Sequence, residues 1–250
     1  MPRWLRPWVF PALVLGALEW WARTIGASSD ALAPPTLAAR AFGKALVDGS
    51  LVGATGFTLA SAAAGLAIAC VLGIVLGTAL GLSRRAASMA FLSVEVLRPV
   101  PSVALIPLAM LVWGFGYRME IAVIAFACFW PMLILAQAAV AQVEPRLLEV
   151  ARALQLSASD RFWKIVLPAM VPRLFVALRL GVAIALVVAV TIEIAANPNG
   201  MGYALMIAQQ SLDPALMLAW LFWIGVVGYG INAGSLWLQA AVARRMGGQA

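Results

Sequence analysis

The residues that could do chemistry in this chain gather in one short block, from Glu144 to Lys164. Charged residues make up only 11% of the whole sequence. Seven of them nevertheless fall in this block: Glu144, Arg146, Glu149, Arg152, Asp160, Arg161 and Lys164. The chain has no histidine, so a Ser-His-Asp or Cys-His catalytic site is excluded, and it has no GxxxxGKS/T phosphate loop. The charges therefore indicate a binding surface rather than a catalytic centre.

The spacing within the block predicts two short helices joined by a turn, over residues 144–168. Pro145 suits the first position of the first helix. One face of that helix is apolar, and it consists of Leu147, Val150, Ala151 and Leu154. The charged side chains on the other face are spaced by three and can pair there: Arg146, Glu149 and Arg152.

The second helix of the block begins near Ser157 or Ser159, either of which can act as its N-cap. It is expected to end at Pro168. Such a hairpin has two interpretations, which the pattern alone leaves open. It is either a docking element for a cytoplasmic partner or an amphipathic loop on the lipid surface.

The rest of the chain is apolar, with 64% hydrophobic residues and a mean hydropathy of +0.98. Long intervals contain no charged residue at all: Gly49–Ser83, Pro99–Tyr117, Ile121–Val143, Ile194–Leu212 and Pro214–Ala243. A membrane-spanning helix needs roughly 20 apolar residues, and backbone groups in lipid must be satisfied within the segment. The sequence therefore predicts an all-α polytopic membrane protein, a single transmembrane domain over 1–250.

We expect six spans. They lie at about 8–22, 51–82, 99–116, 121–142, 169–196 and 215–243, and the segment 33–50 reads as an amphipathic surface helix. Glu19 and Arg23, four residues apart, are expected to pair at the end of the first span. Small residues recur at every fourth position of the second span, where they would let another helix approach closely: Ser61, Gly65, Ala69, Gly73, Gly77 and Gly81.

The distribution of Lys and Arg predicts the orientation of the chain. One side holds both termini and the polar block, and it carries eleven of the 17 basic residues, whereas the other side carries four. The positive-inside rule therefore puts both termini and the polar block in the cytoplasm.

The solute pathway is the other candidate site. Pro99 and Pro101 break the third span, and exposed backbone next to Ser102 is a candidate pore lining. Arg179 is an intramembrane charge that serves either an anionic solute or a structural partner, Glu95 or backbone carbonyls. Glu193, one turn before Asn197, is either a gate or pathway residue or an interfacial carboxylate that reaches water.

The polar block also resembles a known signature. The permease subunits of ABC importers carry the pattern E-A-A-x3-G-x9-I-x-L-P, and this chain matches its intervals with Glu149, Val150, Ala151, Gln155, Ile165, Leu167 and Pro168. Val150 replaces an alanine, and Gln155 replaces a glycine that would turn with positive φ. The segments LRPVPSVALIPLAMLVWGFG, LPAMVPRLFVALRLGVAIA and NPNGMGYALMIA resemble the sulfonate, taurine and nitrate branch of this family, over roughly Leu51 to Met246.

The resemblance implies a type I importer complex in the bacterial cytoplasmic membrane. Two permease copies, as a homodimer, would work with two cytoplasmic ATPases and an external solute-binding protein. Glu149 and its neighbours, including Arg152, would insert into the ATPase, which alone would use ATP and Mg²⁺. This chain would then bind no cofactor, metal or nucleic acid and would catalyse no reaction.

Two other classes of protein remain as alternatives. A self-sufficient secondary transporter or channel is disfavoured because we find no inverted repeat and few intramembrane carboxylates. An intramembrane hydrolase is disfavoured because histidine is absent.

Overall fold

The computed structural model describes residues 6–25 and 33–245, and every regular element in these ranges is helical. The expected end of the family resemblance, at Met246, falls outside the described residues. The chain divides into two compact units, each described by itself. The first contains the described residues up to Thr58 together with Glu193–Val227, and the second contains Leu59–Ile192 together with the described residues from Gly228 onward.

Four helices in the described ranges are long and apolar enough to cross a membrane: Ser50–Leu82, Tyr117–Ala141, Ala158–Ala195 and Pro214–Val242. A bent pair, α4 (Arg84–Leu97) with Ser102–Trp113, raises the count to five. The expected first span falls on α1 (Arg6–Thr24), which is not among them because Glu19 and Arg23 lower the hydropathy of its second half. The count of six spans therefore stays a prediction.

The predicted ridge of small residues lies on α3 (Ser50–Leu82) and packs against α6 (Tyr117–Ala141). A Cβ atom built on Gly77 would lie 2.2 Å from the Leu133 carbonyl oxygen, and one on Gly73 would lie 2.5 Å from Met132 Cβ. Helices in lipid gain no hydrophobic free energy from association, so close backbone contact supplies the attraction. The prediction of a close helix contact is confirmed.

The charged end of α6 is also held by α3. Ser61 donates a short hydrogen bond to the carboxylate of Glu120, and both side chains are fully buried. The sequence predicts that the fourth span begins at about 121, but α6 begins at Tyr117 and includes Glu120 in its first turn. A carboxylate there is favoured because the helix dipole is positive at its N-terminus.

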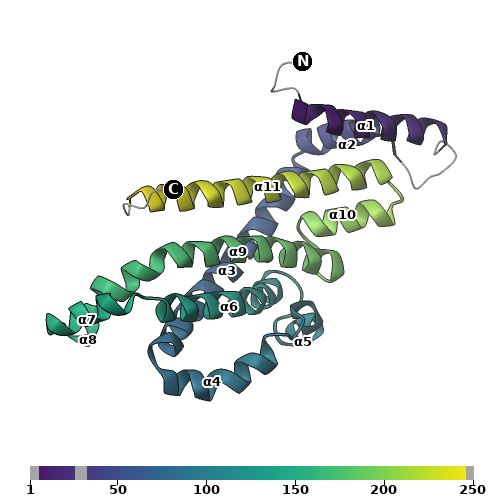
Figure 1. Ribbon diagram of the computed structural model, residues 1–250. Helices are drawn as coiled ribbons and strands as arrows, with labels where there is room; N and C mark the ends of the chain where they lie inside the picture. Colours follow the sequence, from purple (N-terminus) through teal and green to yellow (C-terminus); the bar gives the residue numbers. More distant parts are fainter. Residues whose placement is uncertain (1–5, 26–32, 246–250) are drawn as a thin grey trace. The chain divides into compact units, whose positions relative to one another are not determined.

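The third predicted span is broken, as expected from its prolines. After α4 the chain leaves the helix at Pro99 and Pro101, forms the 3₁₀ turn η1 (Ser102–Leu105) and resumes as α5 (Ile106–Trp113). The two halves are bent by 83°, and the turn is visible between α4 and α5 in Figure 1. No residue of α4 is buried within the chain.

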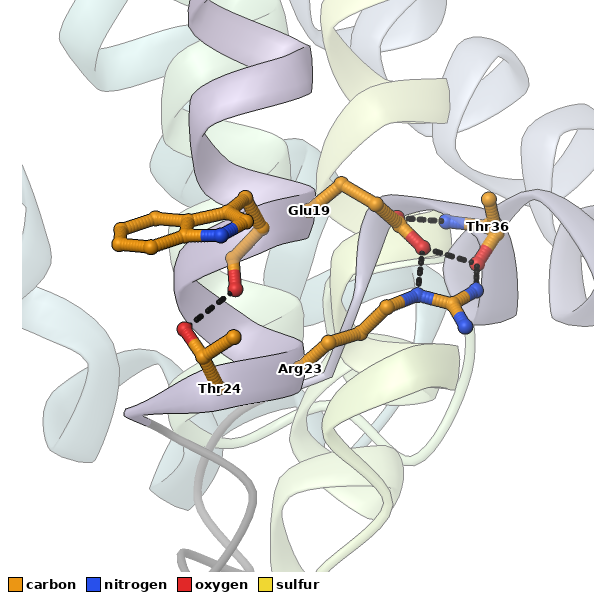
Figure 2. Close-up of polar contacts among 5 residues, drawn as sticks. Glu19, Arg23, Thr24 and Thr36 are labelled. Atoms are coloured by element: carbon orange, nitrogen blue, oxygen red, sulfur yellow. Dashed lines mark hydrogen bonds and ion pairs between the residues drawn. The ribbon is translucent and has the colours of Figure 1, made fainter.

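In the first unit, α1 is joined to α2 (Pro35–Val47) by a small polar network. Glu19 accepts a hydrogen bond from the Arg23 guanidinium, as the spacing predicts, and two more from the N–H and hydroxyl of Thr36 at 3.0 and 2.8 Å (Figure 2). Arg23 also donates to the Thr36 hydroxyl at 3.0 Å. The pair therefore positions the two helices relative to each other.

The polar block contains α7 (Pro145–Ala153), α8 (Ala158–Arg161) and the π-helical turn η2 (Phe162–Val166), which lead into α9 (Leu167–Ala195). α7 and α8 lie together at one end of α9 (Figure 1). The expectation that the second helix ends at Pro168 is wrong, because Ala158–Ala195 is one continuous helix. The π turn makes room for Pro168 in the helix. The Leu167 N–H bonds to the Phe162 carbonyl five residues earlier, and this wider turn relieves the clash that a proline ring causes in a regular α-helix.

We predict that Gly77→Ala destabilises the protein by about 1–3 kcal/mol, because the new methyl group would overlap the Leu133 carbonyl. Gly56→Ala on the same helix is the control, because a Cβ there meets nothing within 4 Å. Thermal unfolding of the purified protein should show a lower Tm for the Gly77 variant alone. Equal Tm values for the two variants would contradict the close α3–α6 contact.

Candidate functional site

The first helix of the hairpin presents an exposed apolar ridge. α7 begins at Pro145 as predicted. Of the four residues expected on one apolar face, only Ala151 is buried, whereas Leu147, Val150 and Leu154 are exposed by 41%, 53% and 65%. Apolar side chains on an exposed helix face are a common feature of sites that bind another protein.

Glu149 lies exposed on the same helix. No ion pair joins it to Arg146, although the spacing allowed one and both residues lie in the described part of the chain. The side chain of Arg152 lies outside the described residues. Glu149 also lines a cavity of about 590 Å³, together with Arg84 of α4 and Arg161 of α8. Glu149 therefore lines the same cavity as two cationic side chains and forms no ion pair with Arg146.

The inner side of the hairpin is fixed to the helices beneath it. Leu148 of α7 and Phe162 of the π turn pack on a buried cluster. The cluster comes from the end of α6 and the residues just after it, from the π turn and from the start of α9: Ala139, Val140, Val143, Val166 and Met170. Burying a side chain of this size contributes about 1.5–3 kcal/mol. The hairpin is thus a rigid extension of α6 and α9 rather than a loose loop.

Gln155 makes the turn between the two helices. Its φ is 49°, in the left-handed region, and the N–H of Leu156 bonds to the Ala151 carbonyl at 3.0 Å, which closes the end of α7. The glycine of the family signature is therefore replaced by a residue that adopts the glycine-like conformation. A side chain in this region costs about 1–2 kcal/mol.

The second helix begins at Ser157, one of the two predicted caps. Its hydroxyl accepts the N–H of Asp160 at 3.0 Å and donates to the Asp160 carboxylate at 2.6 Å. Lys164 pairs with Asp160 one turn later. Of the remaining signature residues, Ile165 lies in the π turn and Leu167 and Pro168 begin α9. Ile165 and Leu167 are half-buried and Pro168 is exposed.

The break between α4 and η1 borders a second cavity, of about 290 Å³. Pro99 and Pro101 are exposed, and Ser102 lines the cavity together with Arg98. The opposite walls come from α6 and α9 and include Trp130. Sequence reasoning identified the prolines and Ser102 but missed Arg98 and Trp130. A tryptophan in the middle of a charge-free run was the available signal, because its N–H needs a partner when buried.

Arg179 lies on α9 and donates from Nε to Oδ1 of Asn232 on α11 (Pro214–Arg245), at 3.3 Å. Its partner is therefore not Glu95, one of the alternatives the sequence left open. Glu95 lies 3.6 Å from the guanidinium of Arg98 instead. Asn232 was not predicted, because a residue 53 positions away has no local signal.

Glu193 is fully buried, so it is not a carboxylate that reaches water. It accepts the N–H of Gly202 at 2.8 Å, at the start of α10 (Met201–Gln210), while Thr58 accepts the N–H of Met201 at 3.0 Å. Gly200 has φ of 92°, and a Cβ there would lie 2.0 Å from the Glu193 carboxylate. Asn197, also buried, accepts a hydrogen bond from Asn199 at 3.5 Å. Glu193 and Thr58 therefore accept two of the free N–H groups at the start of α10.

Comparison with known proteins identifies the fold and the family. The family described as "binding-protein-dependent transport system inner membrane component" matches residues 69–248. The bicarbonate transport system permease protein CmpB of Synechococcus elongatus is 31% identical over 191 residues, 76% of this chain and 68% of that protein. The taurine transport system permease protein TauC of Escherichia coli is 29% identical and covers 68% of this chain and 62% of its own length.

A solved structure shares the fold. The inward-facing MetNI methionine ABC transporter superimposes with a TM-score of 0.65 over 76% of this chain and 94% of that chain, at 18% identity. Permeases for aliphatic sulfonates, from Bacillus subtilis, and for nitrate, from Synechococcus elongatus, are also similar, at 28% and 29% identity over 90% and 74% of this chain. The chain therefore belongs to the binding-protein-dependent transport system inner membrane components, the permease subunits of ABC importers, and its resemblance to the sulfonate, taurine and nitrate branch is confirmed.

Proposed function

We propose that this chain conducts a small anionic solute, such as a sulfonate, taurine or nitrate, inward across the bacterial cytoplasmic membrane. Two copies would form the pathway, and α4, which buries no residue within the chain, supports a partner surface there. An external solute-binding protein would deliver the solute. Two cytoplasmic ATPases would bind ATP and Mg²⁺ and hydrolyse the ATP, and both termini would face the cytoplasm.

The exposed ridge of α7 is the observation that carries this proposal. Leu147, Val150 and Leu154 are large apolar side chains held in the open by the buried cluster below them, with Glu149 beside them. Such a surface supports insertion into a groove of the ATPase, through Glu149, Val150 and the residues that position them. A loop lying on lipid would need no rigid anchor.

The continuous helix from Ala158 to Ala195 supports the coupling step. When the two ATPases close on ATP, they would draw the paired hairpins together. Because α8 and the π turn lead into α9 without a break, the displacement would pass to α9 as the movement of one stiff body. The solute gate would then open on the opposite side of the membrane.

The pathway residues of this proposal are Pro99, Pro101, Ser102, Glu193 and Asn197, and Arg179, the other candidate from the sequence, is proposed as a structural residue. The chain around Pro99 and Pro101 is non-helical, which supports contact with a water-filled space. The bond from Arg179 to Asn232 supports a structural role for this arginine. The cap formed by Glu193 supports a gate role, because α10 would shift if the carboxylate released it.

We predict that Glu149→Lys abolishes ATP-driven uptake, because a reversed charge would face the groove of the ATPase. The loss should be at least tenfold, equivalent to about 1.4 kcal/mol of lost association. Co-purification of the ATPase and uptake into proteoliposomes measure it. Glu144→Lys, an exposed charge reversal just before α7, is the control and should retain both properties. Normal uptake and ATPase association in Glu149→Lys would exclude the coupling role.

We predict that Gln155→Gly stabilises the protein by about 1 kcal/mol and leaves uptake intact, because glycine adopts the observed φ without strain. Ala153→Gly, in the last turn of α7 with ordinary helical geometry, should instead lower the Tm. If both substitutions lower the Tm equally, the left-handed turn at Gln155 is wrong.

We predict that Arg179→Ala reduces uptake and the amount of protein in the membrane together, because it removes the α9–α11 hydrogen bond. Asn232→Ala should have the same effect, and the double variant should be little worse than either single one. Normal accumulation of Arg179→Ala with loss of uptake would instead assign this arginine to the solute pathway.

A further inference from the structure

We propose that the cavity at the α4–η1 break binds the headgroup of a small organic oxyanion through Trp130, Arg98 and Ser102. This inference rests on the proposed function and assigns the class of group that the pathway holds at this point. All the residues that line the cavity belong to the second unit of the chain.

The indole N–H of Trp130 is the first observation behind this inference. The side chain is only 8% exposed, and its Nε1 has no hydrogen-bond acceptor within the described part of the chain. Phe126 and Phe129 pack edge-on against the ring, with centroids 5.6 and 4.9 Å away, and hold it in place. A buried donor that the protein leaves without an acceptor is costly, and a ligand that accepts from it removes that cost.

The other polar side chains of the cavity are donors too. Arg98 contributes a guanidinium and Ser102 a hydroxyl, and none of the described residues that line the cavity is acidic. Glu95 lies 3.6 Å from Arg98, but both side chains are about half exposed, and such a pair binds weakly. The guanidinium has five N–H donors, so it can hold this carboxylate and an anion together.

The apolar part of the wall selects an organic anion over a fully hydrated inorganic one. Phe126 and Ile134 of α6 and Ile184 and Val188 of α9 form it. A volume of about 290 Å³ lies at the lower end of the range for small-molecule sites, roughly 300–1,000 Å³. The cavity therefore fits a ligand with a compact oxyanion at one end and a short carbon group at the other.

The prolines explain why this space exists. Pro99 and Pro101 keep the chain out of the helix, so the α4 and α5 halves diverge by 83° and leave the neighbouring faces of α6 and α9 partly uncovered. Few donors and a half-exposed cation give weak binding, with a dissociation constant on the order of a millimolar. Weak binding suits a transit site, since the solute must leave it in each cycle.

The experiment uses the permease–ATPase complex labelled with 5-fluorotryptophan and reconstituted into nanodiscs. The ¹⁹F signal of Trp130, one of ten tryptophans, is assigned by its disappearance in Trp130→Phe. Sodium methanesulfonate is then titrated at constant ionic strength. We expect a saturable shift of the Trp130 signal, at least threefold weaker binding in Arg98→Gln, and unchanged binding in Arg118→Gln, a control arginine outside the cavity.

Dimethyl sulfone is the matched control ligand, because it has nearly the same shape as methanesulfonate but carries no charge. It should leave the Trp130 signal in place. The inference is overturned if the signal does not move with methanesulfonate, if both compounds shift it equally, or if only a change of lipid composition shifts it.

Failure of this inference differs from failure of the proposed function. If the wild-type complex takes up solute with ATP but the Trp130 signal is static, only the anion site is wrong. If the complex shows no ATP-driven uptake, the proposed function is wrong. The Glu149→Lys permease, reconstituted into nanodiscs without the ATPase, should keep the methanesulfonate shift although it supports no uptake, because Glu149 and the cavity lie in different parts of the second unit.

Discussion

The close approach of α3 and α6 is the contact on which the second unit depends. Lipid offers no hydrophobic gain for bringing two apolar helices together, so the glycines of α3 must let the backbones touch. α6, once held by α3, positions residues at three other sites. Its first turn holds Glu120 against Ser61, its middle holds Trp130 beside the cavity, and its last turn supplies Val140 to the cluster under the hairpin. A bulky residue on the ridge of α3 would displace all three.

The hairpin is anchored to the rigid helices α6 and α9, and this anchoring keeps the outer face of α7 exposed. Its inner side chains are buried against α6 and α9, so its outer ones, Leu147 and Val150, cannot turn inward to escape water. The left-handed turn at Gln155 and the π turn before Pro168 both cost free energy locally. The structure retains them because together they direct α7 outward while keeping α8 continuous with α9.

In the first unit, the main requirement is that the N-terminal N–H groups of α10 find acceptors among apolar residues. The free N–H groups of α10 need acceptors, and the buried carboxylate of Glu193 and the hydroxyl of Thr58 supply them. Gly200 must be glycine because of its positive φ and because the Glu193 carboxylate occupies the position of a side chain. The sequence left a pathway role and an interfacial role open for Glu193, and the structure shows a buried carboxylate that caps the start of α10.

The sequence by itself determined the features that depend on local pattern: the apolar helical segments, the break at Pro99 and Pro101, the small-residue ridge, the start of α7 at Pro145 and the cap at Ser157. These follow from hydrophobic periodicity and from the restricted conformations of proline and glycine, which act over a few residues. Even the family followed from intervals within one short block.

Only the tertiary structure decided what depends on distant partners. It placed Asn232 beside Arg179, brought Trp130 and Arg98 to one cavity, buried Glu193, and let the helix run through Pro168. Each outcome is set by packing between segments far apart in the chain, where many side chains could in principle pair. One pairing is selected because it buries the side chains best when the helices pack together. The local sequence around each residue does not contain this information.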